Sequence, residues 1–471
     1  MKDSRSSSNH DSELQNILGQ RLPRRRLLLL AGSASAAALL RFPTDGLAQT
    51  QGTPAQSQRI RNVLPNGLVV LIDERRTADT IAMELTARDG SRDDSEHPGI
   101  SVMTSRMMFQ GTPRRPSETA LQRAASAVGG SLSRGTSTEM SSFTSVVPSR
   151  EADTAFDLVA DVALNALLDE DALSRQKQIA LQELAQRRAS PNSYIDELFQ
   201  THIFAGHPAA TPVLGTTETI NALTTDAIAA WRRQMWTAPN LVLTITGRIR
   251  PDDALAAAQR YFGGLPSGAK NNPTSSVTIV EPAAREIRGT AGQQQVVFRV
   301  GFVAPSVLDP DRYPMTVLNS IMTGSSGRLF RELRSARGLA YVAGSGYTGL
   351  TDTGAWFATA GVDPQNVEAA LEVVYEQIAR MRDEAPTAEE TARRQGEIAG
   401  RQILADETNS ARASRLASQE LLGTPPTEEY VRRIRAVTPA DVQRVAQTYF
   451  DPDKALLVVV GPDLTSGATS E

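Results

Sequence analysis

The feature that most constrains the fold of this chain is an internal repeat. The segment LTTDAIAAWRRQMWTAPNLVLTITG, which ends at Gly247, aligns without gaps with VTPADVQRVAQTYFDPDKALLVVVG, which ends at Gly461. The offset is constant at 214 residues, so Trp236 falls on Phe450. In each copy a helical pattern leads through an aromatic residue into an apolar run closed by glycine. Two copies of such a unit predict two homologous α+β domains.

A break rich in glycine, proline, asparagine and serine separates the two copies and is typical of a linker. We therefore expect an N-terminal domain over residues 59–265, a linker over 266–281 and a C-terminal domain over 282–464. The flanking residues 49–58 and 465–471 are expected to be flexible. Hydrophobic periodicity predicts strands and then helices in the first domain, the helices near residues 99–109, 117–128, 150–166 and 170–188.

Residues 1–48 have the pattern of an export signal. Arg24, Arg25 and Arg26 precede a largely apolar run of 14 residues, Leu27 to Leu40, which is short for a membrane span but typical of a signal-peptide core. Small residues before Gln49 suit cleavage, and the adjacent arginines resemble a twin-arginine signal. We expect a bacterial periplasmic protein with no membrane association after cleavage. The alternative is an uncleaved membrane anchor.

Composition excludes several classes of function. The net charge is −4 at pH 7, and this acidic balance argues against nucleic acid as the main partner. The chain has no cysteine, which excludes disulfides, thiolate zinc sites, iron–sulfur clusters and cysteine nucleophiles. Of its four histidines, His97, His202 and His207 follow the signal. We expect ordinary surface or loop roles for them, because their spacing does not put them on one helix face.

The segment GISVMTSRMMFQGT, Gly99 to Thr112, resembles a metal-binding motif of the insulinase/pitrilysin metallopeptidases. That family carries G-x-x-H-x-x-E-H-x-x-F-x-G-T, in which two histidines on one helix face bind zinc and the glutamate acts as base. Here the three positions are Val102, Ser105 and Arg106. Only Glu183 stands at the spacing of the family's further glutamate ligand, so the resemblance implies a site that has lost its zinc.

Arg106 is expected to repel a metal ion and to pair with Glu183 instead. The residues around the lost ligands are kept, including Phe109 and Gly111. In the later stretch GGSLSRGTSTE, Ser133 and Arg134 replace the Asn-Ala that family members often show. The resemblance therefore implies that this chain holds no cofactor of its own.

The second half carries another motif of the same family. Residues 324–347 read GSSGRLFRELRSARGLAYVAGSGY, close to the family pattern G-x-x-S-R-L-F-x-x-L-R-x-x-x-G-L-A-Y. The resemblance implies that Arg334 and Tyr341 bind the backbone of a peptide substrate beside the scissile bond. A guanidinium offers a rigid fork of donors, and a phenol can donate to a developing oxyanion. Gly338 is expected to end the helix before a strand that starts near Tyr341.

The resemblance covers the chain from about Arg59 to Leu464 and implies a fold of two α+β domains, each a mixed, mainly antiparallel sheet packed with helices. It implies a noncatalytic subunit of an exported heterodimeric peptidase, whose partner carries H-x-x-E-H and zinc and whose substrates are peptides. One alternative is a structural or chaperone-like pseudoenzyme that binds peptides without cleaving them. A second is an active peptidase with an unusual metal set.

Overall fold

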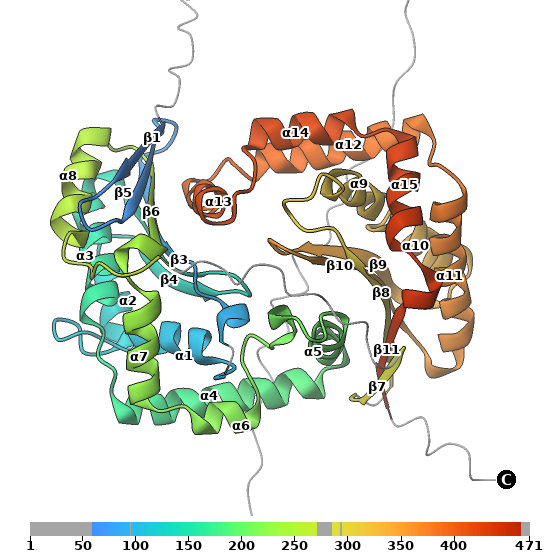
Figure 1. Cartoon of the computed structure of the whole chain (residues 1–471), viewed down its shortest axis with the longest axis horizontal. Coiled ribbons are helices and arrows are strands. Elements are labelled where there is room, and N and C mark those ends of the chain that lie inside the picture. Colours follow the sequence, from blue (N-terminus) through green and yellow to red (C-terminus); the bar gives the residue numbers. More distant parts are fainter. Residues whose placement is uncertain (1–58, 95, 271–284, 293, 463–471) are drawn as a thin grey trace, which may run out of the picture. The chain divides into compact units, whose positions relative to one another are not determined.

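Two β-sheets, each packed with helices, make up the part of the chain that a computed structural model describes, residues 59–94, 96–270, 285–292 and 294–462 (Figure 1). The predicted export signal, the flexible lead, most of the linker and the tail lie outside these residues. The first sheet has the strand order β1-β2-β6-β3-β5-β4. Its strands are β1 (Arg59–Val63), β2 (Val69–Glu74), β3 (Thr80–Ala87), β4 (Ser131–Thr136), β5 (Ser141–Pro148) and β6 (Leu241–Gly247).

The second sheet has the strand order β7-β11-β8-β10-β9. Its strands are β7 (Glu286–Thr290), β8 (Val296–Ala304), β9 (Ala340–Gly349), β10 (Gly354–Val362) and β11 (Leu456–Gly461). Each sheet is antiparallel except for one parallel pair, β2 with β6 and β7 with β11. Both are therefore mixed, mainly antiparallel sheets, as expected.

Helices lie between the strands in both halves. The helices of the first half are α1 (Ile100–Met108), α2 (Glu118–Ala127), α3 (Ala152–Asn165), α4 (Glu170–Ala189), α5 (Pro191–Ile203), α6 (Thr217–Ala222), α7 (Thr225–Met235) and α8 (Pro251–Phe262). Those of the second half are α9 (Arg312–Met322), α10 (Arg328–Phe330), α11 (Val367–Asp383), α12 (Ala388–Leu404), α13 (Asn409–Leu422), α14 (Thr427–Ala436) and α15 (Pro439–Tyr449). The four helices predicted in the first domain are present, and none in the described residues is long and apolar enough to cross a bilayer.

The internal repeat is visible in the structure. Helices α7 and α15 have the same bounds once the offset of 214 residues is applied, and β6 and β11 end on the equivalent glycines. Without β1, the order of the first sheet matches that of the second strand for strand. Equivalent aromatic residues fill equivalent places, since Trp236 packs on Phe143 and Phe450 packs on Trp356. The expected α+β fold of two homologous units is confirmed.

Each sheet is covered on one face by a helix from the other half. Helix α13 packs on β6 and β3, and α5 packs on β11 and β8. Ion pairs join each helix to the sheet beneath it, because Arg412 of α13 pairs with Asp73 of β2 and Asp196 of α5 pairs with Arg299 of β8. The two halves therefore pack as one compact unit.

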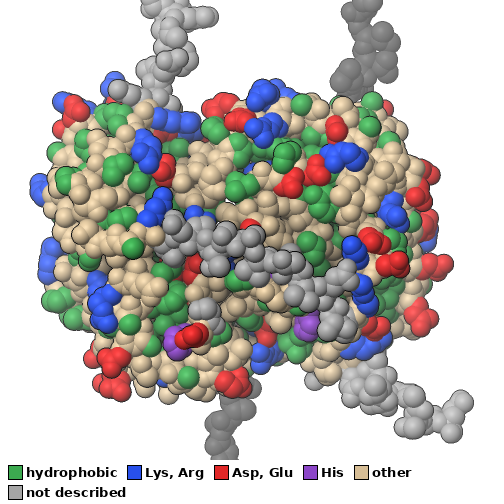
Figure 2. Space-filling model, viewed as in Figure 1, with side chains coloured by type: hydrophobic (Ala, Val, Ile, Leu, Met, Phe, Trp, Pro, Cys, Tyr) green, Lys and Arg blue, Asp and Glu red, His purple; other side chains and the backbone are tan. Residues whose placement is uncertain are grey.

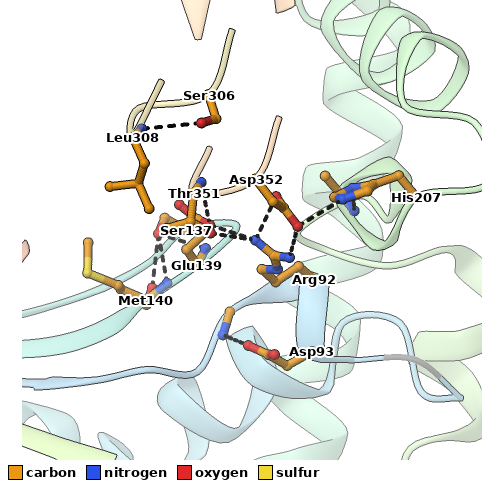
Figure 3. Close-up of polar contacts among 12 residues, drawn as sticks. Arg92, Asp93, Ser137, Glu139, Met140, His207, Ser306, Leu308, Thr351 and Asp352 are labelled. Carbon is orange, nitrogen blue, oxygen red and sulfur yellow. Dashed lines mark hydrogen bonds and ion pairs between the residues drawn. The ribbon is translucent and has the colours of Figure 1, made fainter. Parts of the chain in front are cut away.

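A buried polar network also joins the halves (Figure 3). Arg92 donates to Glu139 at 2.7 Å and to Asp352 at 2.6 Å. Thr351, in the turn between β9 and β10, donates its backbone N–H to Glu139 at 3.0 Å. His207 Nδ1 accepts from the backbone of Ala209, so the proton lies on Nε2 and points to Asp352, 3.2 Å away. The Arg92 and Glu139 side chains are 7% and 8% exposed, so this is a desolvated ion pair.

Replacing Arg92 by methionine is expected to lower the free energy of unfolding by about 3–5 kcal/mol, because Glu139 would remain buried without its cation. Urea denaturation of the purified chain measures the effect. Arg76→Met is the matched control, since Arg76 is 70% exposed and its pair with Glu74 is worth about 1 kcal/mol or less. Equal, small effects of the two substitutions would contradict a structural role for the network.

Gly247, the last residue of the first repeat, allows a second test. Its φ is +135°, and a Cβ there would collide with the carbonyl oxygen of Thr80. We expect Gly247→Ala to lower the free energy of unfolding by roughly 2 kcal/mol or more. Thermal unfolding of the purified variants measures the effect. Gly264→Ala, where a Cβ meets open space, is the control and should leave the unfolding midpoint nearly unchanged. An unchanged midpoint for Gly247→Ala would contradict the strained strand end.

Candidate functional site

The degenerate metal motif lies on α1, which is buried along its whole length. Gly99 caps the helix with φ +94°, and a Cβ there would press on the Leu214 carbonyl at 2.6 Å. The Asp94 carboxyl accepts from the backbone N–H groups of Gly99 at 2.7 Å and Ser101 at 3.2 Å. Burial raises the pKa of Asp94 to about 8, against the opposing effect of these hydrogen bonds. The start of α1 is thus fixed in place by a buried carboxyl group that accepts the first backbone N–H groups of the helix.

Neither of the motif's two ligand positions, Val102 and Arg106, nor its base position, Ser105, holds a metal-binding group. Val102 is 7% exposed and packs among the apolar residues between α1 and α4. The Ser105 hydroxyl is buried and has no hydrogen-bond partner among the described residues. Arg106 donates from Nη2 to Glu183 Oε2 at 2.6 Å. The expected pairing of Arg106 with Glu183 is therefore present, and the guanidinium stands where the motif would place its second zinc ligand.

A second arginine adds to the positive charge at this site. Arg134 of β4, one of the two residues that replace Asn-Ala, has its guanidinium 5.9 Å from the centre of the Phe109 ring. Burial and the charge of nearby Arg106 both lower the pKa of Arg134. Two arginines beside one carboxylate, with valine in place of an imidazole, do not fit Zn²⁺, which needs nitrogen, oxygen or sulfur donors. This chain therefore offers no zinc site at the family position.

The remaining histidines do not rebuild a metal site. His202 contacts the carbonyl of Leu198 through Nδ1, and His97 is exposed. His207 lies in a loop as expected, but it is buried in the polar network with Asp352, which the sequence did not predict. Among the described residues no three His, Cys, Asp or Glu side chains come together in a way that would hold a metal ion.

Arg334 and Tyr341 lie close together at the surface of the second half. Arg334 is in a short π-helical segment, Arg331–Ala336, and Gly338 follows with φ +64°, so the helix ends there and β9 begins at Ala340, as predicted. The Arg334 guanidinium donates to the backbone carbonyl of Tyr341 and lies 5.4 Å from the centre of the Phe330 ring. Both side chains are exposed; Tyr341 lies on β9, an edge strand of the second sheet, and Arg334 lies in the helical segment just before it.

The sequence did not reveal the partner of Tyr341. Its hydroxyl donates to Asp363 at 2.9 Å, and this hydrogen bond, with the carboxylate charge, raises the pKa of Tyr341. The phenol therefore keeps its proton and points it at Asp363 in this conformation. Asp363 follows β10 in the segment GVDPQN. Only the pairing of β9 with β10, which brings residue 340 opposite 362, could have indicated this contact.

The surface of the molecule has no single sign of charge on the face drawn in Figure 2, where lysine and arginine side chains stand among aspartate and glutamate. Across the described residues, exposed arginines also pair with carboxylates, as Arg61 does with Glu420 and Arg444 with Asp311. On this face the described residues do not form the continuous basic surface that nucleic-acid binding requires.

Comparison with known protein families now identifies the class. Residues 69–217 match the model described as insulinase (peptidase family M16), and residues 222–396 match the model described as peptidase M16 inactive domain. Together with the repeated fold and the kept residues around the degenerate motif, these matches define the class of protein. The chain belongs to the insulinase family, and Val102 and Arg106 stand where the family motif has its two histidine ligands.

Its relatives include proteins named as zinc proteases. It is 28% identical to an uncharacterized zinc protease of Streptomyces coelicolor, over 85% of this chain and 89% of that protein. It is 25% identical to another from Bacillus subtilis, over 85% of this chain and 97% of that one. A peptidase M16 inactive domain from Pseudomonas fluorescens has the same fold, with a TM-score of 0.80, 22% identity, and coverage of 86% and 99%. A protease from Helicobacter pylori matches equally well, with a TM-score of 0.80, 20% identity, and coverage of 86% and 100%.

Restoring the family's zinc-binding residues on α1 is expected to restore zinc binding. The combined change Val102→His, Ser105→Glu and Arg106→His restores the family motif opposite Glu183, and we expect about one tightly bound zinc ion per chain. Metal analysis after dialysis against a weak chelator measures the zinc. The same triple variant with Glu183→Gln is the control and should bind far less. Equal zinc in the triple variant and its control would contradict Glu183 as the remaining ligand position.

Proposed function

We propose that this chain is the noncatalytic, substrate-binding subunit of an exported insulinase-family zinc metallopeptidase. The observation that carries the proposal is the ion pair of Arg106 with Glu183, which occupies the position of the zinc site. In the same chain, Arg334 and Tyr341 remain exposed and close together. A chain that has lost the ligands but keeps this pair is suited to bind a peptide that another chain cleaves.

The proposed chemistry follows from the donors at the surface. Arg334 donates to the Tyr341 carbonyl through Nη1, and the rest of its exposed guanidinium fork can donate to a peptide carbonyl. The Tyr341 hydroxyl would exchange Asp363 for the oxygen of the scissile carbonyl, where negative charge develops during attack. Tyr341 lies on the edge strand β9 and Arg334 in the helical segment just before it, so an extended chain would reach both without a change of fold.

The partner in this proposal is a second insulinase-family chain that carries H-x-x-E-H. Zinc held by that chain would supply the activated water, and this chain would supply no metal ligand. The signal-like residues 1–48 support export to the bacterial periplasm, and a folded pair of chains could use a twin-arginine route on one signal. Peptides or unfolded segments are the substrates that two donors to an extended backbone suit.

The test uses the complex isolated with the tagged chain from its native host. Zinc content and peptidase activity are assayed on the complex and on the chain purified alone, and we expect both in the complex only. In the complex, Arg334→Ala and Tyr341→Phe should each lower the cleavage rate at least about tenfold, because each removes a donor to the peptide. Arg380→Ala, which removes an exposed arginine paired with Glu384 on α11, is the control and should leave the rate unchanged.

Three results would change the proposal. Undiminished cleavage by both the Arg334 and Tyr341 variants would overturn the substrate-binding assignment. Zinc and activity in the chain alone would overturn the noncatalytic assignment. A chain that binds peptides, yet co-purifies with no H-x-x-E-H protein and no activity, would be the chaperone-like pseudoenzyme instead.

A further inference from the structure

A small aromatic cavity lies where α5 of the first half packs on the second sheet. Its volume is about 230 Å³. Three phenylalanine rings, Phe199, Phe204 and Phe357, line it together with Leu350. Thr348 and Asp196 are exposed members of the lining, so the cavity opens to solvent. We call this space the Arg299 cavity after the one cation in its lining.

Arg299 is held in an unusual environment. The residue is 7% exposed, and its guanidinium lies 3.9 Å from the centre of the Phe357 ring and 5.2 Å from that of Phe199. These rings cover the guanidinium by cation–π contacts, which satisfy its faces but not its N–H groups. New hydrogen bonds must therefore form in the plane of the guanidinium, along its edges.

The hydrogen bonds that Arg299 makes do not use all the N–H donors along the edge of its guanidinium. Nη2 donates to Asp196 Oδ1 at 2.7 Å, whereas the buried Nε has no partner among the described residues. Asp196 is a weak counter-ion, because its side chain is 66% exposed and is screened by water. Burial lowers the pKa of Arg299, which is the sign of a cation that is poorly compensated by its surroundings.

We propose that the Arg299 cavity binds the C-terminal residue of a peptide, with an apolar side chain among the phenylalanine rings and the terminal carboxylate on the guanidinium edge of Arg299. A carboxylate supplies both the missing acceptor and the missing negative charge. A volume of about 230 Å³ has room for one large side chain and not for a folded segment. The proposal concerns this chain alone and does not depend on a catalytic partner.

The chemistry recognised, an apolar group beside a carboxylate, also occurs in free aromatic acids. The experiment therefore compares four probes by fluorescence polarisation or competition with the purified chain. These are a labelled heptapeptide that ends in phenylalanine with a free carboxylate, its C-terminal amide, the same peptide ending in glycine, and N-acetylphenylalanine as competitor. We expect the free-acid phenylalanine peptide to bind at least about tenfold more tightly than the amide or the glycine peptide, because only it fills both parts of the site.

Variants separate the carboxylate from the apolar part. Arg299→Met keeps much of the packing, leaves behind only the exposed Asp196, and should abolish the preference for the free acid over the amide. Thr348→Trp fills the opening, keeps Arg299 in the chain, and should weaken binding of both phenylalanine peptides at least about tenfold. Arg288→Met, at an exposed arginine of β7 paired with Glu286, is the matched control and should change neither.

Three results would overturn the proposal. The first is equal binding of the free acid and the amide by the wild-type chain, and the second is an acid preference that survives Arg299→Met. The third is competition by N-acetylphenylalanine as strong as by the unlabelled phenylalanine peptide, which would assign the cavity to free aromatic acids. If Arg299→Met does not fold, unchanged binding by Thr348→Trp overturns the proposal in its place.

Discussion

The exchange of helices between the two halves is the interaction on which the rest of the structure depends. Neither sheet covers its own second face, because α13 lies on the first sheet and α5 lies on the second. These helices bury charged side chains of the sheets and pair with them. Asp73 is buried under α13 and pairs with Arg412, and Arg299 is buried under α5 and pairs with Asp196. Separating the halves would expose apolar surface on both sheets and break these pairs. The repeat therefore folds as one unit, and the cavity at Arg299 exists only because a helix of the other half forms one of its walls.

Packing in the core of the first half explains why the residues around the metal motif are kept although its histidine ligands are absent. Phe109 is buried and stacks on Phe143, 5.9 Å between ring centres, in the core of the first half. Gly111 has φ +146° and no room for a Cβ, and Thr112 donates to the buried Asp161 at 2.7 Å. These residues support the fold whether or not zinc is present. The ligand positions have been filled in a way that also suits the fold, because Val102 packs in the core and Arg106 pairs with Glu183.

Much of the fold could be predicted from the sequence because its signals are local. The helices of the first half, the glycine-closed strands and the turn at Gly338 depend on periodicity and on single residues, and the repeat extends them to the second half. The contacts that the sequence did not reveal join distant positions. His207 and Asp352 are 145 positions apart, and Arg299 and Asp196 are 103 apart. No periodic pattern marks such partners, since only the exchange of helices and the hairpin of β9 and β10 brings them together.

Arg334 and Tyr341, the proposed binding pair, are held in place and still accessible. Arg334 donates to the Tyr341 carbonyl, and the Tyr341 hydroxyl donates to the Asp363 carboxylate, so these contacts restrict the conformations of both side chains. Both side chains are exposed, and water competes for such hydrogen bonds, so exchanging them for peptide contacts costs little. Arg106 is the opposite case, because it is 7% exposed and breaking its pair with Glu183 would leave a buried cation. The two arginines therefore differ in burial. The buried Arg106 fills the position of the zinc site, whereas the exposed Arg334 stays accessible at the proposed peptide site.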